Sequence, residues 1–235
     1  MAIQVLIPIL LFCAEAFSQT SLPLDCADIY DEGFRANGVY TIYPACATSP
    51  QYVYCDMETD GGKWTVFQRR MDGTVNFFRG WEQYRNGFGH AAGEYWLGLE
   101  AIHLLTEKTK YELRVDMEDF KGNKAFAKYS SISIRNELDG YRLTVSGFHN
   151  GGTGDSLAYH SGQKFSTYDR DQDSNNDSNC AFVGMGAFWY NSCYHANPNG
   201  LYSWGESSVL GANWRTFKEF NSLKAISMKI RPLGN

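Results

Sequence analysis

The cysteines of this chain constrain its fold more than any other feature. One of the six, Cys13, lies in an apolar segment at the N-terminus, and the others are Cys26, Cys46, Cys55, Cys180 and Cys193. In an oxidising compartment these five thiols predict two disulfide bonds and one cysteine left over. Their spacing leaves the connectivity open, although it favours a local bond between Cys180 and Cys193. On the entropic model, each closed loop restricts the unfolded chain by about 3 kcal/mol.

The N-terminal segment predicts that the chain is secreted. Residues 1–18 are mostly apolar and end in small residues at the spacing of a signal-peptidase site, so we expect a signal peptide cleaved after about Ser18. The alternative is a buried N-terminal helix. No later stretch approaches the roughly 18 apolar residues of a membrane-spanning helix. We therefore predict a secreted protein with no membrane span, a short tail over residues 19–25 and one domain over residues 26–233.

The composition excludes several classes of protein. Hydrophobic residues make up 43% of the chain and the formal net charge is −5, which excludes long disorder. There is no Gly-X-Y repeat and no sustained heptad, so a collagen-like or coiled-coil stalk is excluded. Without a basic cluster, the acidic balance argues against a nucleic-acid partner. The Gly-x-Ser-x-Gly, His-Glu-x-x-His and Cys-x-x-Cys motifs do not occur, so we expect no enzymatic activity.

The pattern of apolar residues predicts short strands and a few helices. Strand-like runs occupy residues 38–43, 51–57, 64–69, 110–116, 125–134 and 141–148, and residues 99–109 suit a helix. From His149 to Leu210 the chain is rich in Gly, Asn, Asp, Ser and Tyr and shows little periodicity. So long an irregular stretch is uncommon in a compact domain unless something else orders it. A Cys180–Cys193 bond is one such tie, and a bound cation is a second.

The segment between Tyr168 and Cys180 contains an Asp-x-Asp-x-Asp pattern that begins at Asp169. Carboxylates at alternate positions of a turning loop can gather the oxygen ligands that Ca²⁺ prefers. The segment is not an EF-hand, because Ser174 and Cys180 stand where that motif has a glycine and a bidentate glutamate. We favour a calcium site over the alternative, a solvated acidic loop, because the loop adjoins a predicted disulfide in an otherwise unsupported region.

A set of ordered motifs runs through nearly the whole mature chain. They include Cys26-Ala-Asp28-Ile-Tyr, Tyr54-Cys55-Asp56-Met57, Gly61-Gly62-Lys63-Trp64, Gly93-Glu94-Tyr95-Trp96, His160-Ser161-Gly162-Gln163 and Met228-Lys229-Ile230-Arg231. In these motifs the chain resembles the fibrinogen-related domains. The resemblance implies an α+β, fibrinogen C-terminal-like domain with a small N-terminal subdomain, a central antiparallel sheet with helices, and a loop-rich calcium-binding C-terminal subdomain. It also implies disulfides Cys26–Cys55 and Cys180–Cys193, with Cys46 either free or in an intermolecular bridge.

The same resemblance implies a set of calcium ligands in the acidic loop. The side-chain ligands would be Asp171 and Asp173, with backbone carbonyl ligands at Asn175 and Asp177. Asp173 precedes Cys180 by one residue more than is usual in the family, so the carbonyl ligands can slip by one position. Asn176 begins an Asn-Asp-Ser sequon in the same loop and is therefore a candidate glycosylation site.

Family members that recognise acetylated groups bind them in an aromatic pocket beside this loop. The corresponding residues here are Trp189, Tyr190, Ser192, Cys193, Tyr194 and His195. In the family a cis peptide often precedes the second loop cysteine and a histidine follows it, and here Tyr194 takes the place of that histidine. The backbone N–H groups of Cys193 and Tyr194 remain available to an acetyl oxygen. The Tyr-Ala pair that walls the acetyl methyl group is missing from the shortened stretch 207–212.

The aromatic residues, 15% of the chain, also have a purely structural interpretation. Scaffold motifs of the family contain four of the tryptophans, which we expect in the core: Trp64, Trp81, Trp96 and Trp214. For Trp189 and Tyr190 both interpretations, core and ligand contact, stay open.

Two functions follow as expectations. The first is a secreted, calcium-binding, lectin-like protein that recognises acetylated glycans or microbial surfaces in innate immunity. The alternative is a structural or adhesion protein of the extracellular matrix that is associated with elastic microfibrils and binds elastic-fibre proteins. No Arg-Gly-Asp tripeptide occurs, which argues against simple integrin adhesion. In either case we expect a homo-oligomer, because multivalency compensates for weak single sites.

Overall fold

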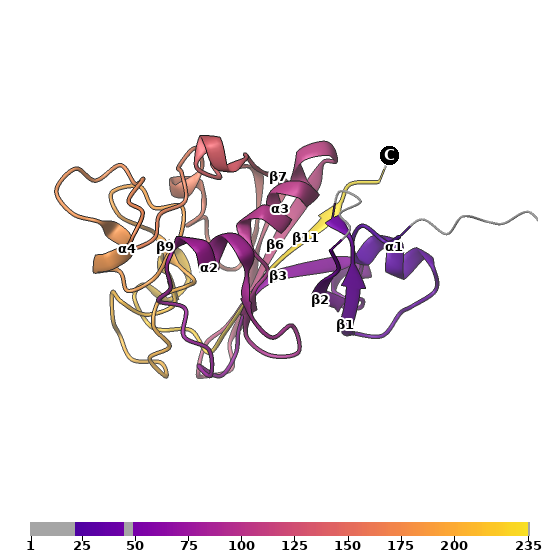
Figure 1. Ribbon diagram of the computed structural model, residues 1–235. Helices are drawn as coiled ribbons and strands as arrows, with labels where there is room; N and C mark the ends of the chain where they lie inside the picture. The colour runs from indigo at the N-terminus through magenta and orange to yellow at the C-terminus, as the bar shows by residue number, and fades with distance from the viewer. Residues whose placement is uncertain (1–21, 45–48, 235) are drawn as a thin grey trace, which may run out of the picture.

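The computed structural model describes residues 22–44 and 49–234 (Figure 1). The predicted signal peptide and Cys46 lie outside these residues. Within the described ranges, no helix has both the length and the apolar character needed to cross a membrane. The description begins in the expected N-terminal tail and covers the expected domain except for residues 45–48.

An antiparallel sheet of nine strands forms the centre of the domain. Its main path has the order β1-β2-β3-β11-β6-β7-β8, and β4 and β5 are attached at β3. The strands are β1 (Gly38–Ile42), β2 (Gln51–Asp56), β3 (Trp64–Arg70), β4 (Phe88–Gly89), β5 (Tyr95–Trp96), β6 (Tyr111–Glu118), β7 (Lys124–Ile134), β8 (Leu143–Gly151) and β11 (Ala225–Pro232). Every strand expected from the sequence is present, with its ends shifted by a few residues at most. The alternation of apolar and polar residues therefore located these strands, but it did not predict β4, β5 or β11.

The last strand of the chain lies in the middle of this sheet. On one side β11 pairs with β3, so that Ser227 lies opposite Arg69, and on the other it pairs with β6, so that Ser227 lies opposite Asp116. A bulge between Met228 and Lys229 shifts the register against β3. Because β11 is hydrogen-bonded on both edges, the sheet is complete only when the C-terminal segment is in place.

Lys229 of β11 is a buried cation between β2 and β6, with only 3% of its surface exposed. Its Nζ lies 2.6 Å from Asp56 Oδ2 and 2.5 Å from Asp116 Oδ2. The other oxygen of Asp56 accepts the backbone N–H of Thr59 at 2.9 Å. Burial opposes ionisation of Asp56, but the charge and hydrogen bond of Lys229 outweigh it and lower the pKa of this carboxyl to about 2. One ammonium group thus connects two strands that are not neighbours in the sheet.

The helices are short and lie around the sheet. They are α1 (Cys26–Asp31), α2 (Trp81–Asn86), α3 (Leu99–Lys108), α4 (Cys180–Val183) and α5 (Arg215–Lys218), with 3-10 turns at Thr59–Gly61, Glu137–Asp139 and Ala158–His160. The helix expected over residues 99–109 is α3, which lies beside α2 on one side of the sheet (Figure 1). It is fixed to the end of β7, because Ile134 N–H donates to Thr106 Oγ1 at 3.1 Å and the Ile134 carbonyl lies 2.9 Å from His103 Nδ1.

A small N-terminal subdomain consists of α1, β1 and β2. Asp25 caps α1, with its Oδ1 accepting the N–H of Ala27 at 2.7 Å. The Tyr111 hydroxyl of β6 donates to the other carboxylate oxygen, and burial raises the pKa of Asp25. The disulfide Cys26–Cys55 joins α1 to β2 with a Cα–Cα distance of 5.5 Å. The cap and the disulfide therefore fix α1 within the subdomain, and the hydrogen bond from Tyr111 ties it to β6.

Between β8 and β11 the chain forms mostly irregular loops, which are orange and yellow in Figure 1. Beyond α4, α5 and one 3-10 turn, the regular structure of this region is a two-stranded ribbon of β9 (Ala196–Asn197) and β10 (Asn213–Trp214). The disulfide Cys180–Cys193 closes a separation of 13 residues. Beneath the loops, the Trp189 ring packs edge-to-face on Phe165 with centroids 5.1 Å apart. The four tryptophans expected in the core are all buried: Trp64, Trp81, Trp96 and Trp214.

The Asp56–Lys229 pair predicts how stability depends on pH. The folded-state pKa of Asp56, about 2, is below the ordinary value of 3.8, so its contribution is present above about pH 4 and is lost as the pH falls through about 2. We expect Asp56→Asn to lower the free energy of unfolding at pH 7 by about 1–2 kcal/mol, allowing for solvent screening. This difference should shrink between pH 4 and pH 2 in urea titrations. The exposed neighbour Glu58 supplies the control, Glu58→Gln, and a loss that is the same at every pH would contradict the assignment.

Candidate calcium and ligand site in the C-terminal loops

The acidic loop is folded around the side chain of Asp173. Its Oδ1 accepts the backbone N–H of Asn175 at 2.9 Å, and its Oδ2 accepts the N–H of Cys180 at 2.8 Å. Asp171 Oδ1 lies 3.3 Å from the N–H of Asp173, and Asn175 Oδ1 accepts the N–H of Asp177 at 3.0 Å. Short polar side chains that bond to the backbone two residues ahead favour tight turns. The loop therefore gathers its oxygen atoms on the inside of successive turns next to the disulfide.

The two aspartates predicted as calcium ligands lie next to each other. Burial and the neighbouring charge of Asp171 raise the pKa of Asp173 to about 6. Neither carboxylate forms an ion pair with a cation of the described residues. Although both oxygens of Asp173 accept N–H groups, each carboxylate oxygen has a second lone pair that can bind a cation. The pair is thus negatively charged, partly shielded and uncompensated, which fits a hard cation.

The other loop residues add oxygen atoms but no compact group of acidic side chains. Asn176 and Asp177 are exposed, and exposure of Asn176 is compatible with a glycan. Within the described part of the chain, no three His, Cys, Asp or Glu side chains are grouped to hold a metal ion. A calcium ion at this loop would therefore depend on backbone carbonyls beside Asp171 and Asp173, as predicted for Asn175 and Asp177. The predicted ligand set remains an expectation.

The segment around Cys193 lies against this loop. Ser174 N–H donates to the carbonyl of Asn191 at 3.2 Å, which joins the two segments. The peptide bond between Ser192 and Cys193 is cis, as is often the case in the resembled family. Asn191 N–H donates to the Cys193 carbonyl at 2.8 Å, and the Tyr159 hydroxyl donates to the Ser192 carbonyl at 3.1 Å. The carbonyl groups on both sides of the cis bond are thereby occupied.

Two backbone donors of this segment are left without an acceptor. Within the described residues, the N–H groups of Cys193 and Tyr194 form no hydrogen bond, and both residues are half-buried. Nearly all shielded backbone N–H groups in folded proteins are paired with protein, water or a ligand. Two adjacent unpaired donors are a place where one carbonyl or acetyl oxygen can bind.

The aromatic residues expected around this turn differ in their placement. Trp189 and Tyr190 have 0% exposure, so of the two interpretations left open for them the structure favours the core. Tyr190 instead donates its hydroxyl to Asn197 at 2.6 Å. Tyr194 packs against Tyr190 with ring centroids 5.4 Å apart, and His195 stacks on Tyr159 at 4.0 Å. Among the predicted pocket residues, Ser192 is exposed and Cys193, Tyr194 and His195 are half-buried.

A buried histidine that the sequence did not single out fixes this segment. His160 Nδ1 lies 2.7 Å from the Trp189 carbonyl, and its Nε2 lies 3.2 Å from the N–H of His195 and 3.0 Å from that of Ala196. Since Nε2 accepts, the ring is neutral with its proton on Nδ1. Burial lowers the pKa of His160 to about 4. In the sequence His160 stood out only as part of a family motif, because its partners are backbone groups and leave no residue pattern.

The role of His160 predicts a second pH dependence. The unfolded chain takes up a proton near pH 6.5 and the folded chain only near pH 4, so stability falls as the pH drops between these values, by up to about 3 kcal/mol. We expect His160→Gln to lose about 2 kcal/mol at pH 7, because buried backbone groups lose their partner, and to flatten the slope in this range. Urea unfolding between pH 7 and pH 4 measures both effects. The exposed His149 provides the control His149→Gln, and an unchanged slope in the His160 variant would refute this role.

Comparison with known proteins identifies relatives over most of the chain. The family of the fibrinogen beta and gamma chains, C-terminal globular domain, matches residues 22–233. Microfibril-associated glycoprotein 4 of Bos taurus is 60% identical over 218 residues, covering 89% of this chain and 85% of the relative. The Homo sapiens protein of the same name is 58% identical over 217 residues, with the same coverage of 89% and 85%. Fibrinogen C domain-containing protein 1 of Homo sapiens is 49% identical over 216 residues, which cover 88% of this chain but 46% of that protein.

Solved structures agree with the sequence comparisons. The fibrinogen-like globe domain of human ANGPTL6 superposes with a TM-score of 0.86 at 41% identity, covering 91% of this chain and 96% of that chain. A lamprey fibrin D-dimer, solved with the peptide ligand Gly-His-Arg-Pro-amide, superposes with a TM-score of 0.84 at 36% identity, covering 91% and 74%. The expected fibrinogen-like α+β fold is therefore confirmed.

The relatives also indicate that the protein is extracellular. Proteins with this domain are generally binding proteins rather than enzymes, and the relatives at 58–60% identity are microfibril-associated glycoproteins, which belong to the extracellular matrix. The two disulfides suit the same oxidising environment. This chain is an extracellular member of the fibrinogen-related family, with the fold of the C-terminal globular domain of the fibrinogen beta and gamma chains.

Proposed function

We propose that the protein is a calcium-binding recognition protein that binds acetylated groups of glycans or microbial surfaces at the turn around Cys193. The observation that carries this proposal is the pair of unpaired backbone N–H groups at Cys193 and Tyr194. Two donors side by side can bind one acetyl oxygen without help from any side chain, so the replacement of the family's histidine by Tyr194 leaves them intact. The exposed Ser192 and the half-buried rings of Tyr194 and His195 would border the bound group.

A calcium ion would support this site by ordering the neighbouring loop. Asp171 and Asp173 would hold the cation, with the carbonyls of Asn175 and Asp177 as further ligands. Asp173 accepts the N–H of Cys180, which is bonded covalently to Cys193. Neutralising the aspartate pair would remove the repulsion that raises the pKa of Asp173. Calcium would thus stabilise the loop on which the recognition turn rests, without touching the ligand.

A second candidate function is association with elastic microfibrils. It is favoured by the 60% identity to a protein named microfibril-associated glycoprotein 4. Under this alternative, matrix proteins would be the partners and sugar binding would not be required. Either function gains from a homo-oligomer, in which several weak sites act together. The two functions differ in whether the Cys193 turn is occupied when the partner binds.

Replacing Asp173 tests the calcium site. We expect calcium to raise the melting temperature of the wild type and to have no effect on Asp173→Asn, because one of two carboxylate ligands is lost. In chelator above pH 6, the variant should be as stable as the wild type or more so, because the ionised aspartate pair no longer repels itself. Asp177→Asn is the matched control, since it removes a charge from the same loop but keeps the backbone carbonyl. A wild type that melts identically with calcium and with chelator would exclude the site.

Backbone amide signals test the recognition turn. We expect N-acetylglucosamine, in the presence of calcium, to shift the ¹H–¹⁵N signals of Cys193 and Tyr194, because their N–H groups acquire an acceptor. Glucosamine, which lacks the acetyl group, should leave both signals in place. If N-acetylglucosamine moves neither signal while purified elastic microfibrils bind the protein, the matrix function replaces the lectin function.

A further inference from the structure

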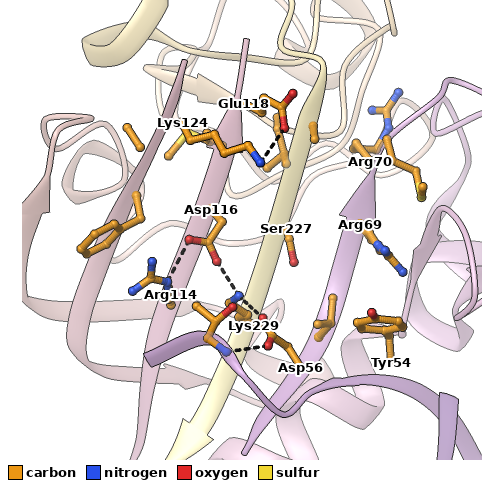
Figure 2. A pocket seen from close by; sticks show the side chains of 18 of the residues that line it. Tyr54, Asp56, Arg69, Arg70, Arg114, Asp116, Glu118, Lys124, Ser227 and Lys229 are labelled. Carbon is orange, nitrogen blue, oxygen red and sulfur yellow. Dashed lines mark hydrogen bonds and ion pairs between the residues drawn. The ribbon is translucent and has the colours of Figure 1, made fainter. Parts of the chain in front are cut away.

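A cavity of about 710 Å³ opens on the central sheet (Figure 2). It extends over β3, β11, β6 and β7 and reaches β2 at its edge. None of its lining residues lies between positions 152 and 224, so it is separate from the loops that hold the candidate calcium site. Its volume is in the range of small-molecule sites. Neither the recognition turn nor the calcium loop accounts for it.

Two rows of polar side chains cross the floor of this cavity. In the first row, Ser227 of β11 pairs with Arg69 of β3 and with Asp116 of β6. In the second row, Lys229 of β11 pairs with Arg114 of β6. Residues two apart on a strand share a face of the sheet, which is why both rows line the same cavity.

The acidic side chains of the cavity are all neutralised by neighbouring cations. Asp56 and Asp116 lie 2.6 Å and 2.5 Å from Lys229 Nζ. Asp116 also accepts a hydrogen bond from Arg114 Nε at 2.8 Å, and two lysines lie near the carboxylate of Glu118. Figure 2 shows the Lys124–Glu118 pair in its upper part and, below it, Arg114, Asp116, Lys229 and Asp56 linked by dashed lines. The acids therefore leave no free charge to attract a cation.

Arg69 is the cation that these pairs leave out. It forms no ion pair with any described residue, and its Nη1 is shielded from solvent without a hydrogen-bond acceptor. The neighbouring Arg70 is different, because it pairs with Glu94 and donates to the Gly200 carbonyl at 2.7 Å. The guanidinium carbon of Arg69 lies 4.2 Å from the centroid of the Tyr54 ring. A guanidinium held over a ring keeps its in-plane N–H donors available to an acceptor at its edge.

The hydroxyl of Ser227 is a second group without a partner. It forms no hydrogen bond with the described residues and is half-exposed in the cavity. In Figure 2 it stands between Asp116 and Arg69, in the middle of the floor. A hydroxyl both donates and accepts, so at this place it suits the hydroxyl of a ligand.

We propose that this cavity binds a small, hydroxyl-rich ligand with one carboxylate, the chemistry of a uronic sugar. Arg69 has no acidic partner among the described residues, and the planar guanidinium matches a carboxylate in a charge-assisted pair. The carboxylate pairs with Arg69 beside Tyr54, and the sugar ring lies over Ser227 toward the paired charges of β6. Those paired groups supply donors and acceptors for the hydroxyls of the ring.

The test uses methyl β-D-glucuronide as the probe and methyl β-D-glucoside as its neutral control. Both are titrated into the full mature chain by calorimetry in excess chelator, so that failure of the calcium site cannot affect the result. We expect the glucuronide to bind and the glucoside to give no measurable heat. Arg69→Gln should weaken glucuronide binding about tenfold or more, because a charge-assisted hydrogen bond is lost. Arg69→Lys should restore part of it, and Ser227→Ala should weaken it about threefold.

The exposed Arg135, outside the cavity, supplies the matched control Arg135→Gln, which removes the same charge without an effect on binding. Unfolding midpoints of all variants show whether each one is folded, and Ser227→Ala keeps the proposal testable should Arg69→Gln be unstable. Equal binding of glucuronide and glucoside, or unchanged binding by Arg69→Gln, would overturn the proposal. So would binding of a blocked aspartyl peptide when the glucuronide does not bind, because the site would then be a peptide site.

Discussion

The position of β11 is the constraint on which the rest of the structure depends. The last strand of the chain lies between β3 and β6 and is hydrogen-bonded to both. The two parts of the sheet on either side of it, β1–β3 and β6–β8, are therefore joined only when the C-terminal segment is in place. Lys229 reinforces this closure, because its ammonium group binds Asp56 on one side and Asp116 on the other. Such a buried cation is costly unless both partners are present. The network accordingly favours the one register in which all three side chains meet.

The C-terminal loops contain almost no strands or helices, so regular structure pairs few of their backbone N–H and C=O groups. Side chains take over this task. His160 binds three backbone groups of the segment 189–196, Asp173 binds the N–H of Cys180, and Asn179 caps α4 through the N–H of Phe182. The aromatic rings beneath exclude water, so these bonds form where an unpaired group would be expensive. In such a region the two N–H groups left unpaired at Cys193 and Tyr194 stand out against an otherwise well-satisfied backbone.

The difference between the sheet and the loops also explains how much of the structure could be predicted from the sequence. Strand positions such as β6 are local properties of alternation, and the sequence predicted them within a few residues. The partners of β11 could not be predicted from pattern, because pairing across more than a hundred residues leaves no local signal. The burial of Trp189 and Tyr190 was equally hidden, since it depends on which loop folds over them. His160 and Arg69 had no recognisable pattern either. His160 acts through backbone groups, and Arg69 is notable only because its guanidinium has no hydrogen-bond acceptor at Nη1 among the described residues.

The two candidate sites of this acidic chain have opposite local charges. The loop concentrates uncompensated carboxylates at Asp171 and Asp173, whereas the sheet face pairs its carboxylates and leaves Arg69 over. A net charge of −5 would by itself repel an anionic ligand at long range. Salt screens the distant charges, so an anion near the sheet face feels this repulsion only weakly. It is attracted only when it is close to the Arg69 guanidinium. Recognition of an anion there would therefore be short-range. A cation at the loop would, by contrast, be attracted by the net charge of the whole molecule, and salt would weaken that attraction.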